Sequence, residues 1–434
     1  MRVLTVRGAE LVWDGVGAAV PGGEIACGAD GRVVADGVTG PVLDASGCVV
    51  TPGLVNAHHH LLQTAFRTLP GTRGVPMREW LPRMAAAYAT VGVDAELAHA
   101  AAAAGLAEAV LCGVTTVADH HLTWPRGDGV EIALAVAGAA AELGARLVFV
   151  RGSARDDPQE AARSADAIAR ALHGVDRDGG PDGRVQVAVG PAGVHSDGPE
   201  TYRLLAEVAA RHGLRRRTQA GEQVDVEVAA QRYGRRPLEL LDEWGWLAPD
   251  VTLAHLCGVT GAEVARVAAA GASATHAPGC DLPMGWGVAP MAALSDAGVA
   301  VGLGTSGGGS NDAGHLLADA RLALQVAPLA GRPVSAAEVL GWATTGGADG
   351  LGRPELGRLT PGSMADLACW DVTGVADAGV ADPLAGLLWA APGRRPRHVV
   401  VGGRVVVRDG ELVARPEREV AAALHALLGT RPPR

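Results

Sequence analysis

Hydrophobic residues in the central part of the chain, from residue 52 to about residue 354, form short β-branched runs that alternate with longer Ala-rich stretches. A run of about four to eight apolar residues bounded by turn residues is typical of a buried strand. Eight such runs predict strands at 54–58, 114–119, 146–151, 185–190, 214–219, 251–255, 272–276 and 299–304.

The stretches between these runs have the length and composition of helices. They predict helices at 94–111, 159–172, 200–212, 224–232 and 261–270, followed by two more at 312–325 and 335–344. Eight strands that are each followed by a helical stretch favour an α/β fold, a parallel (β/α)8 TIM barrel, over an open doubly wound sheet.

The two ends of the chain have a different pattern. Residues 1–51 contain short strands broken by Gly, Asp and Pro, and residues 355–415 contain three runs in the same style, with Gly402 and Gly403 as a hairpin turn. Both flanks predict antiparallel β structure. We therefore expect a discontinuous β-sandwich domain of residues 1–51 and 355–434 around a catalytic barrel of residues 52–354.

Composition narrows the class of protein. The 434 residues carry 37 Lys and Arg against 47 Asp and Glu, a net charge of −10, so nucleic acid is not expected as a partner. Charged residues or His interrupt the most Ala-rich stretches, which argues against a membrane span, and the N-terminus lacks the apolar segment of a signal peptide. The six Cys include no C-x-x-C pair. We expect a cytoplasmic protein.

Histidines gather where the predicted strands end. Catalytic residues of a (β/α)8 barrel lie at the carboxyl ends of its strands, so residues at these positions are expected to share one rim. Eight of the 14 His fall there: His58, His59, His60, His120, His121, His195, His255 and His276.

The pair His58 and His60 ends the first predicted strand. Residues two apart on a strand share a face, so these two imidazoles can bind one cation. An isolated H-x-H is often only a polar loop segment. Here a Pro-Gly turn at Pro52 joins the β flank to the first barrel strand and delivers the pair at the mouth of the barrel, which favours a metal site.

Several segments carry a family resemblance: TPGLVNAHHHLLQTAFR (51–67), TTVADHH (115–121), TQAGEQ (218–223), LAHLCGV (253–259), THAPGCD (275–281) and VGLGTSGGGSND (301–312). LGRLTPGSMADLACWD (356–371) and HVVVGGRVVVRDG (398–410) match the flanking sandwich. The chain resembles the amidohydrolase superfamily, in particular its cytosine, guanine and 8-oxoguanine deaminases and its triazine hydrolases. The resemblance covers essentially the whole chain, with the motifs in order.

The resemblance implies one divalent metal, zinc in the first instance, held by the H-x-H pair, a His that ends strand five and an Asp that ends strand eight. It implies that Glu222 transfers a proton to the ring nitrogen of the substrate and that His255 orients the water or the tetrahedral intermediate. His276 matches the strand-seven His, which could contact substrate.

Two positions depart from the family pattern, because Gln219 stands at the strand-five ligand position and Ser306 at the strand-eight position. Both are neutral, weak ligands. Some triazine hydrolases of this branch carry a hydroxyl residue at the second position, so Ser306 fits them. Gln219 has two explanations, an engineered substitution that silences catalysis or a natural loss of the ligand.

Further residues are candidates for the substrate pocket, each with an alternative. Gln63 matches an amide that meets the polar edge of the substrate, or it faces solvent. Trp80, in the long loop after strand one, covers the pocket or belongs to the core. Arg151 and His195 bind substrate or are structural. Asp281 stands where relatives often have Asn, so recognition is expected to differ.

These observations predict a metal-dependent hydrolase that acts on a planar nitrogen heterocycle or cyclic amidine, by deamination, dechlorination or ring opening. The rival prediction is a degenerate, metal-poor amidohydrolase that binds a ligand without hydrolysing it, which the changes at Gln219 and Ser306 favour. Family analogy also points to a homo-oligomer.

Overall fold

Eight parallel strands close into a barrel in the computed structural model, which describes residues 3–35, 40–125, 129–173 and 183–433. Consecutive strands pair side by side, and the eighth pairs with the first to complete the ring. The strands are β8 (Leu54–His60), β9 (Val114–His121), β10 (Arg146–Ser153), β11 (Val185–Pro191), β12 (Arg215–Ala220), β13 (Val251–His255), β14 (Ser273–His276) and β15 (Val301–Leu303). The predicted (β/α)8 barrel is confirmed.

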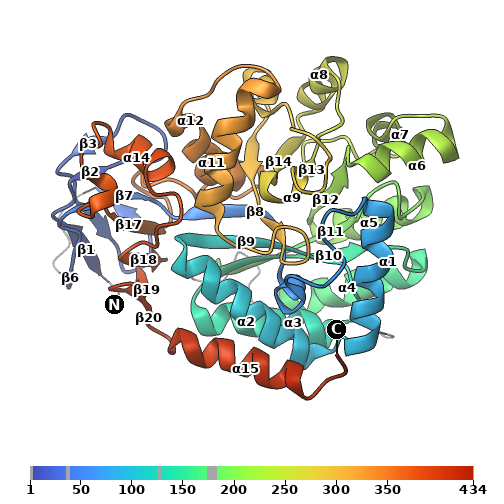
Figure 1. Ribbon diagram of the computed structural model, residues 1–434, viewed down its shortest axis with the longest axis horizontal. Helices are drawn as coiled ribbons and strands as arrows, with labels where there is room; N and C mark the ends of the chain where they lie inside the picture. Colours follow the sequence, from blue (N-terminus) through green and yellow to red (C-terminus); the bar gives the residue numbers. More distant parts are fainter. Residues whose placement is uncertain (1–2, 36–39, 126–128, 174–182, 434) are drawn as a thin grey trace.

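Helices surround the barrel and cover the outer face of its strands, most of whose residues are buried (Figure 1). Local signals begin several of them: Asp94 accepts a hydrogen bond from the Leu97 amide, and Thr260 with Glu263 forms a capping box. The helices are α2 (Ala95–Leu111), α3 (Val130–Leu143), α4 (Pro158–His173), α5 (Pro199–His212), α6 (Gln223–Tyr233), α7 (Pro237–Glu243), α8 (Gly261–Ala270), α9 (Pro278–Asp281), α10 (Met291–Asp296), α11 (Leu316–Val326), α12 (Ala336–Gly341) and α13 (Gly347–Gly350).

A helix stands where the sequence had suggested only a long loop after the first strand. It is α1 (Met77–Val91), and Pro82 lies inside it. Its buried positions nevertheless follow a helical spacing of three and four residues: Met77, Trp80, Met84, Ala87 and Val91. The spacing of these apolar residues predicts a helix, although a Pro inside a segment usually argues against one.

The two chain ends build two sheets beside the barrel. One has the order β5 (Val33–Val34), β4 (Ile25–Cys27), β1 (Leu4–Arg7) and β6 (Val42–Asp44). The other has the order β20 (Glu411–Leu412), β19 (Arg404–Arg408), β18 (His398–Val401), β17 (Leu367–Asp371), β7 (Cys48–Pro52), β2 (Leu11–Val12) and β3 (Val20–Pro21). Antiparallel pairing of β7 with β17 joins the two ends, and β7 leads directly into β8. The boundaries at residues 51 and 355 stay a prediction.

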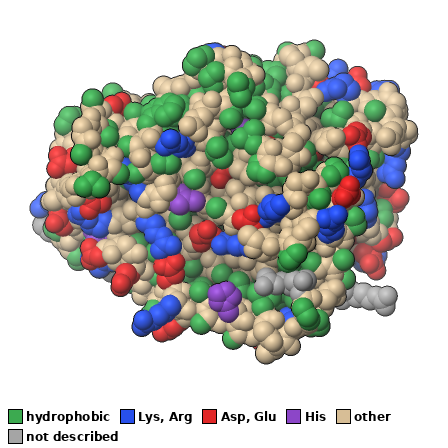
Figure 2. Space-filling model, viewed as in Figure 1, with side chains coloured by type: hydrophobic (Ala, Val, Ile, Leu, Met, Phe, Trp, Pro, Cys, Tyr) green, Lys and Arg blue, Asp and Glu red, His purple; other side chains and the backbone are tan. Residues whose placement is uncertain are grey.

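The C-terminal segment returns to the barrel. After α14 (Pro383–Trp389), the last helix, α15 (Glu417–Gly429), packs along α2 (Figure 1). No helix within the described residues is long and apolar enough to cross a membrane. Figure 2 shows positive and negative side chains interspersed over the lower half of the face it presents.

A buried ion pair connects the barrel to the flanking sheets. Arg146, at the start of β10, donates from Nε to Asp366 Oδ2 at 2.7 Å and from Nη2 to Asp366 Oδ1 at 3.0 Å, and both side chains are about 1% exposed. Removing one partner leaves an uncompensated buried charge, which typically costs about 3–5 kcal/mol.

We therefore expect Asp366→Ala to lower the free energy of unfolding by about 3–5 kcal/mol in a denaturant titration. The double variant Arg146→Met with Asp366→Leu removes both charges and should recover part of that loss. Equal destabilisation in the single and double variants would contradict the expectation.

Candidate functional site

Strand β8 delivers two imidazoles to the mouth of the barrel. The rings of His58 and His60 lie with their centroids 4.9 Å apart, and both are buried. Both ring nitrogens of His58 are buried without a hydrogen-bond partner among the described residues, and Nδ1 of His60 lies 2.6 Å from the carbonyl oxygen of His120. His59 turns the other way and contacts the Thr305 hydroxyl, as strand alternation predicts.

Two further imidazoles lie beside His58. The ring centroid of His255, at the end of β13, is 4.9 Å away, and that of His120, near the end of β9, is 6.1 Å away. Nε2 of His120 lies 3.0 Å from the carbonyl oxygen of Gly190. Burial lowers the pKa of His58 well below its usual value and that of His60 to about 4, so both rings are neutral at pH 7 and hold a lone pair for a cation.

The backbone holds His255 in an unusual conformation. Its φ is 76°, and φ of Leu256 is 55°, so two non-Gly residues in succession are left-handed. Such conformations cost about 1–3 kcal/mol each and cluster at functional sites. Burial opposes a charge on His255, but the Asp281 carboxylate outweighs it and raises the pKa of the imidazole.

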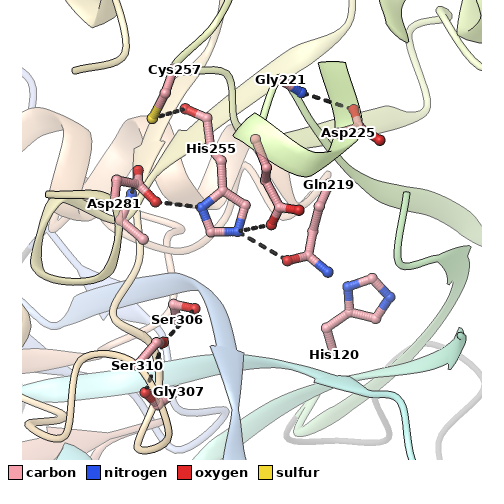
Figure 3. Close-up of polar contacts among 12 residues, drawn as sticks. His120, Gln219, Gly221, Asp225, His255, Cys257, Asp281, Ser306, Gly307 and Ser310 are labelled. Carbon is pink, nitrogen blue, oxygen red and sulfur yellow. Dashed lines mark hydrogen bonds and ion pairs between the residues drawn. The ribbon is translucent and has the colours of Figure 1, made fainter. Parts of the chain in front are cut away.

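Gln219 and Ser306 reach the site from β12 and from β16 (Ser306–Gly307). The Gln219 side chain lies between His255 and His120 in Figure 3, with Oε1 3.0 Å from Nε2 of His255. Ser306 has a left-handed φ of 52°, and its hydroxyl lies 3.5 Å from that of Ser310. Both family ligand positions therefore hold neutral oxygen donors.

Glu222 lies at the start of α6 and is about 1% exposed. Neither of its carboxyl oxygens has a hydrogen-bond partner within the described part of the chain. Oε1 is 3.5 Å from Nε2 of His255, and Oε2 is 3.8 Å from Nδ1 of His195. Burial raises the pKa of Glu222 to about 7, so the group can both hold and release a proton near neutrality.

His195 follows β11 and is fixed by an acidic neighbour. Its Nδ1 lies 3.3 Å from Oδ1 of Asp225, and the same oxygen accepts a hydrogen bond from the His195 backbone amide. Burial disfavours the imidazolium, but Asp225 and the charge of Glu222 outweigh this effect and raise the pKa of His195. Because His195 also lines the cavity, it can meet a substrate there.

A cavity of about 810 Å³ opens above these groups. Its polar floor includes His60, His120, Gln219, Glu222 and Ser306, whereas His58 and His255 lie just behind it. Its apolar walls come largely from α1, the short 3-10 helix after β8 and two loops: Leu62, Met77, Trp80, Leu81, Met84, Tyr88, Trp124, Met284 and Trp286. Polar groups at one end and aromatic walls elsewhere suit a flat heterocycle.

Trp124 and Trp286 form two of these walls. The Trp124 ring is fixed from behind by Arg151, whose guanidinium carbon is 4.7 Å from the ring centroid, and its Nε1 donates to the Gly152 carbonyl. Trp286 packs edge-on against His255, with centroids 5.0 Å apart. Its indole N–H is buried without a hydrogen-bond partner among the described residues, so it is a donor that a ligand can use.

The structure does not bring all predicted pocket residues to the cavity. Arg151 lies behind Trp124 and pairs with Asp156 at 2.7 Å. His276 and Asp281 lie behind His255. Neither residue lines the cavity. Asp281 contacts Nδ1 of His255 and Nδ1 of His276 instead.

Gln63 and Trp80 do line the cavity, and both are tied to the backbone of Gly309. Gln63 Oε1 accepts a hydrogen bond from the Gly309 amide at 3.0 Å, and Trp80 Nε1 donates to the Gly309 carbonyl at 3.1 Å. Trp80 lies on α1 and not in a loop, which corrects the sequence prediction. Trp80 thereby ties α1, and Gln63 the short 3-10 helix Leu61–Phe66 that follows β8, to the loop after the eighth strand.

Two site residues were undervalued from the sequence. His120 was named only among the histidines at the predicted strand ends, without a role at the site, yet it forms part of the cavity floor. Asp119 lines the cavity, is fully buried, and has a pKa that burial raises to about 7. Its Oδ1 accepts from the Leu61 amide at 2.7 Å, while Oδ2 has no hydrogen-bond partner among the described residues and lies 3.9 Å from Nδ1 of His121. Their place at the end of the second strand was the available signal.

The donor groups fit a divalent cation. Two neutral imidazoles with buried, unpartnered or inward-facing nitrogens are preferred ligands of zinc. The hydrogen bond that His60 makes through Nδ1 leaves its Nε2 free, as in metal-binding His side chains in general. Gln219 and Ser306 can add oxygen atoms but no negative charge.

Comparison with known proteins agrees with this chemistry. The Amidohydrolase family matches residues 49–406. An 8-oxoguanine deaminase from Pseudomonas aeruginosa is 38% identical over 89% of both chains, and a 5-methylthioadenosine/S-adenosylhomocysteine deaminase from Natronomonas pharaonis is 34% identical over 88% of this chain and 87% of its own. The crystal structure of atrazine chlorohydrolase from Arthrobacter aurescens TC1, complexed with zinc, superposes with a TM-score of 0.89 at 33% identity over 98% of this chain and all of that one.

Proposed function

This chain belongs to the amidohydrolase family, and from that premise we propose that it uses metal-activated water to hydrolyse a C–N or related bond of a nitrogen heterocycle or cyclic amidine. The observation that carries the proposal is Glu222, a buried carboxyl group with a pKa near neutrality, 3.5 Å from His255 and beside an aromatic-walled cavity. Such a group serves as a general acid and base. The relatives act on small heterocycles, which supports this substrate class.

His58 and His60 would hold the metal, with Gln219 and Ser306 as the nearest neutral oxygen donors. A divalent metal bound there supplies a water activated for attack near neutral pH. The zinc in the atrazine chlorohydrolase structure supports zinc as its identity. Because neither oxygen donor is charged, we expect the site to bind zinc more weakly than a site with His and Asp at these two positions.

The chain's own residues carry the remaining steps. Glu222 takes a proton from the attacking water and delivers it to a ring nitrogen or to the leaving group, since its pKa lies close to the working pH. The Asp281 carboxylate raises the pKa of His255, so its ring can carry a second proton and donate from Nε2, next to Glu222, to the oxygen of the attacked carbon, where negative charge develops. Trp124 and Trp286, in the cavity wall, pack against the substrate ring and exclude water from it.

A second candidate is a ligand-binding protein that has lost hydrolysis. It is favoured by Gln219, whose amide oxygen contacts Nε2 of His255 at 3.0 Å where the family places a metal ligand. Elemental analysis separates the two functions: a protein that is metal-free after zinc loading and still binds a heterocycle supports this alternative. Bound zinc together with turnover supports the hydrolase.

A panel of amino-, chloro- and alkylamino-substituted purines, pterins and triazines tests the proposed hydrolase. The zinc-loaded protein and its Gln219→His variant are assayed in parallel for release of ammonia, amine or chloride. We expect turnover of at least one substrate class. If both zinc-loaded proteins leave every compound unchanged, the proposal is abandoned.

The size of the cavity predicts a substituted ring. A void of about 150 Å³ accommodates benzene, whereas this cavity measures about 810 Å³ and continues along Met77, Leu81 and Met84 of α1. Each buried methylene adds about 0.8 kcal/mol, so two methylenes in an alkyl substituent should raise kcat/KM by roughly tenfold. A homologous series measures this increase, and Met84→Trp should reduce it. A flat series would contradict the prediction.

A further inference from the structure

The Asp281 carboxylate joins the ends of two neighbouring barrel strands from behind the site. Oδ1 lies 2.6 Å from Nδ1 of His255, which ends β13, and Oδ2 lies 2.8 Å from Nδ1 of His276, which ends β14. The carboxylate is fully buried and is not among the residues that line the cavity. Asp281 contacts Nδ1 of His255, whereas Nε2 of the same ring faces Gln219 and Glu222, which line the cavity, so any influence of Asp281 on the reaction passes through the imidazoles.

These contacts fix the chemistry of the His255 ring. An ionised carboxylate only accepts hydrogen bonds, so Nδ1 of His255 must carry its proton and Nε2 is the nitrogen left for the reaction. Nε2 faces Gln219 Oε1 at 3.0 Å (Figure 3). It also lies 3.5 Å from Glu222 Oε1. An amide can accept from a protonated Nε2 through its oxygen or donate to a bare Nε2 through its NH2 group. Gln219 thus tolerates either state of Nε2.

The backbone conformation at His255 is a second, independent sign that its surroundings hold this residue in place. His255 and Leu256 both have left-handed φ values, 76° and 55°. A non-Gly residue stays in this conformation only where its surroundings hold it there. The Leu256 amide donates to the Ala220 carbonyl at 2.9 Å, and Asp281 holds the side chain of His255 at its other end. The residue is consequently held once beside its backbone and once at its ring.

We propose that Asp281 is a positioning residue for the hydrolytic reaction: it holds His255 in the orientation and tautomer that present Nε2 to the reacting atoms, with His276 as its second anchor. The effect of Asp281 on the reaction rate rests on the proposed function, whereas its effect on the position of the His255 ring does not. It also explains why an acidic residue stands at a place where the resemblance suggests Asn. An Asn could donate to Nδ1 and stabilise the opposite tautomer.

The test is Asp281→Asn in the zinc-loaded protein. Outer partners of site histidines are typically worth about 10- to 100-fold, so we expect kcat to fall by roughly that factor while KM changes little. Proton NMR gives a readout that does not depend on turnover. The His255 Nδ1 proton should give a low-field resonance, assigned by its absence in His255→Asn, and this resonance should disappear in Asp281→Asn.

Asp319→Asn is the matched control. Asp319 is a buried carboxylate on α11 that accepts from the Gly279 amide at 2.7 Å, so its replacement disturbs the same short helix, α9, without removing the partner of His255. The control should keep the low-field resonance, and its kcat should stay within about threefold of the parent value. Equal losses in both variants, or an unchanged resonance in Asp281→Asn, would overturn the positioning role. Loss of the resonance in a protein that hydrolyses nothing would overturn only the proposed function.

Discussion

Replacing Glu222 by Gln should lower kcat by roughly 10²–10⁴-fold, because general acid–base catalysis contributes on that scale. Gln has nearly the same shape but cannot take a proton from water or deliver one to a ring nitrogen. The other residues that line the cavity are untouched, so affinity for a heterocyclic inhibitor should change little. Steady-state turnover and calorimetric binding measure the two effects.

The same variant should change the pH dependence of stability. Burial raises the pKa of Glu222 from 4.5 to about 7 in the folded protein, so its contribution is fully present below pH 4.5 and is lost as the pH rises through 7. A difference of about 2.5 pH units corresponds to roughly 3 kcal/mol. Glu222→Gln does not titrate. Its free energy of unfolding relative to the parent should therefore rise by up to roughly 3 kcal/mol between pH 5 and pH 8 in metal-free protein.

Glu227→Gln is a suitable control, because Glu227 lies on the same helix and its side chain contacts only Gln223 among the described hydrogen bonds. It should preserve both turnover and the pH dependence of stability. If Glu222→Gln retained full turnover, Glu222 could not be the proton carrier. If its stability followed that of the parent at every pH, the carboxyl would not be titrating near neutrality.

The fold could be predicted from the sequence because most strands of a parallel barrel are buried on both faces and form short, largely apolar runs. Those runs end at the site, so the positions of His58, His60 and His255 followed from strand ends alone. Strand alternation also placed His59 on the opposite side. These features depend on local pattern and on one rule of topology.

Other features depend on tertiary contacts and were beyond local pattern. Arg151 lies near the end of β10, which runs two residues further than predicted, but it stacks behind Trp124 and pairs with Asp156 rather than reaching the cavity. Asp281 was expected to touch substrate, and its contacts with His255 and His276 became visible only when the strands were in place. No spacing in the sequence relates residues that are joined across neighbouring strands.

Replacing Gln219 by His should raise zinc affinity by on the order of 10²-fold. A four-ligand structural zinc site is worth about 10–16 kcal/mol, so one ligand averages roughly 3 kcal/mol, and each 1.4 kcal/mol is a factor of ten. Gln219 lies beside His255 and His120 at the end of β12, where an imidazole would join His58 and His60. Adding Ser306→Asp should strengthen binding again, because it supplies the negative charge that the present donors lack.

Competition with a chromophoric chelator, together with the zinc retained after dialysis, measures this gain. Gln186→His is the matched control: Gln186 lies near the start of β11, where its Nε2 donates to the Leu351 carbonyl, so a new imidazole there is remote from the site. A gain in affinity and turnover only at position 219 would identify Gln219 as a replaced ligand. If neither zinc affinity nor turnover increases, position 219 does not contribute a metal ligand, and the Gln219 amide acts as a hydrogen-bond partner of His255 instead.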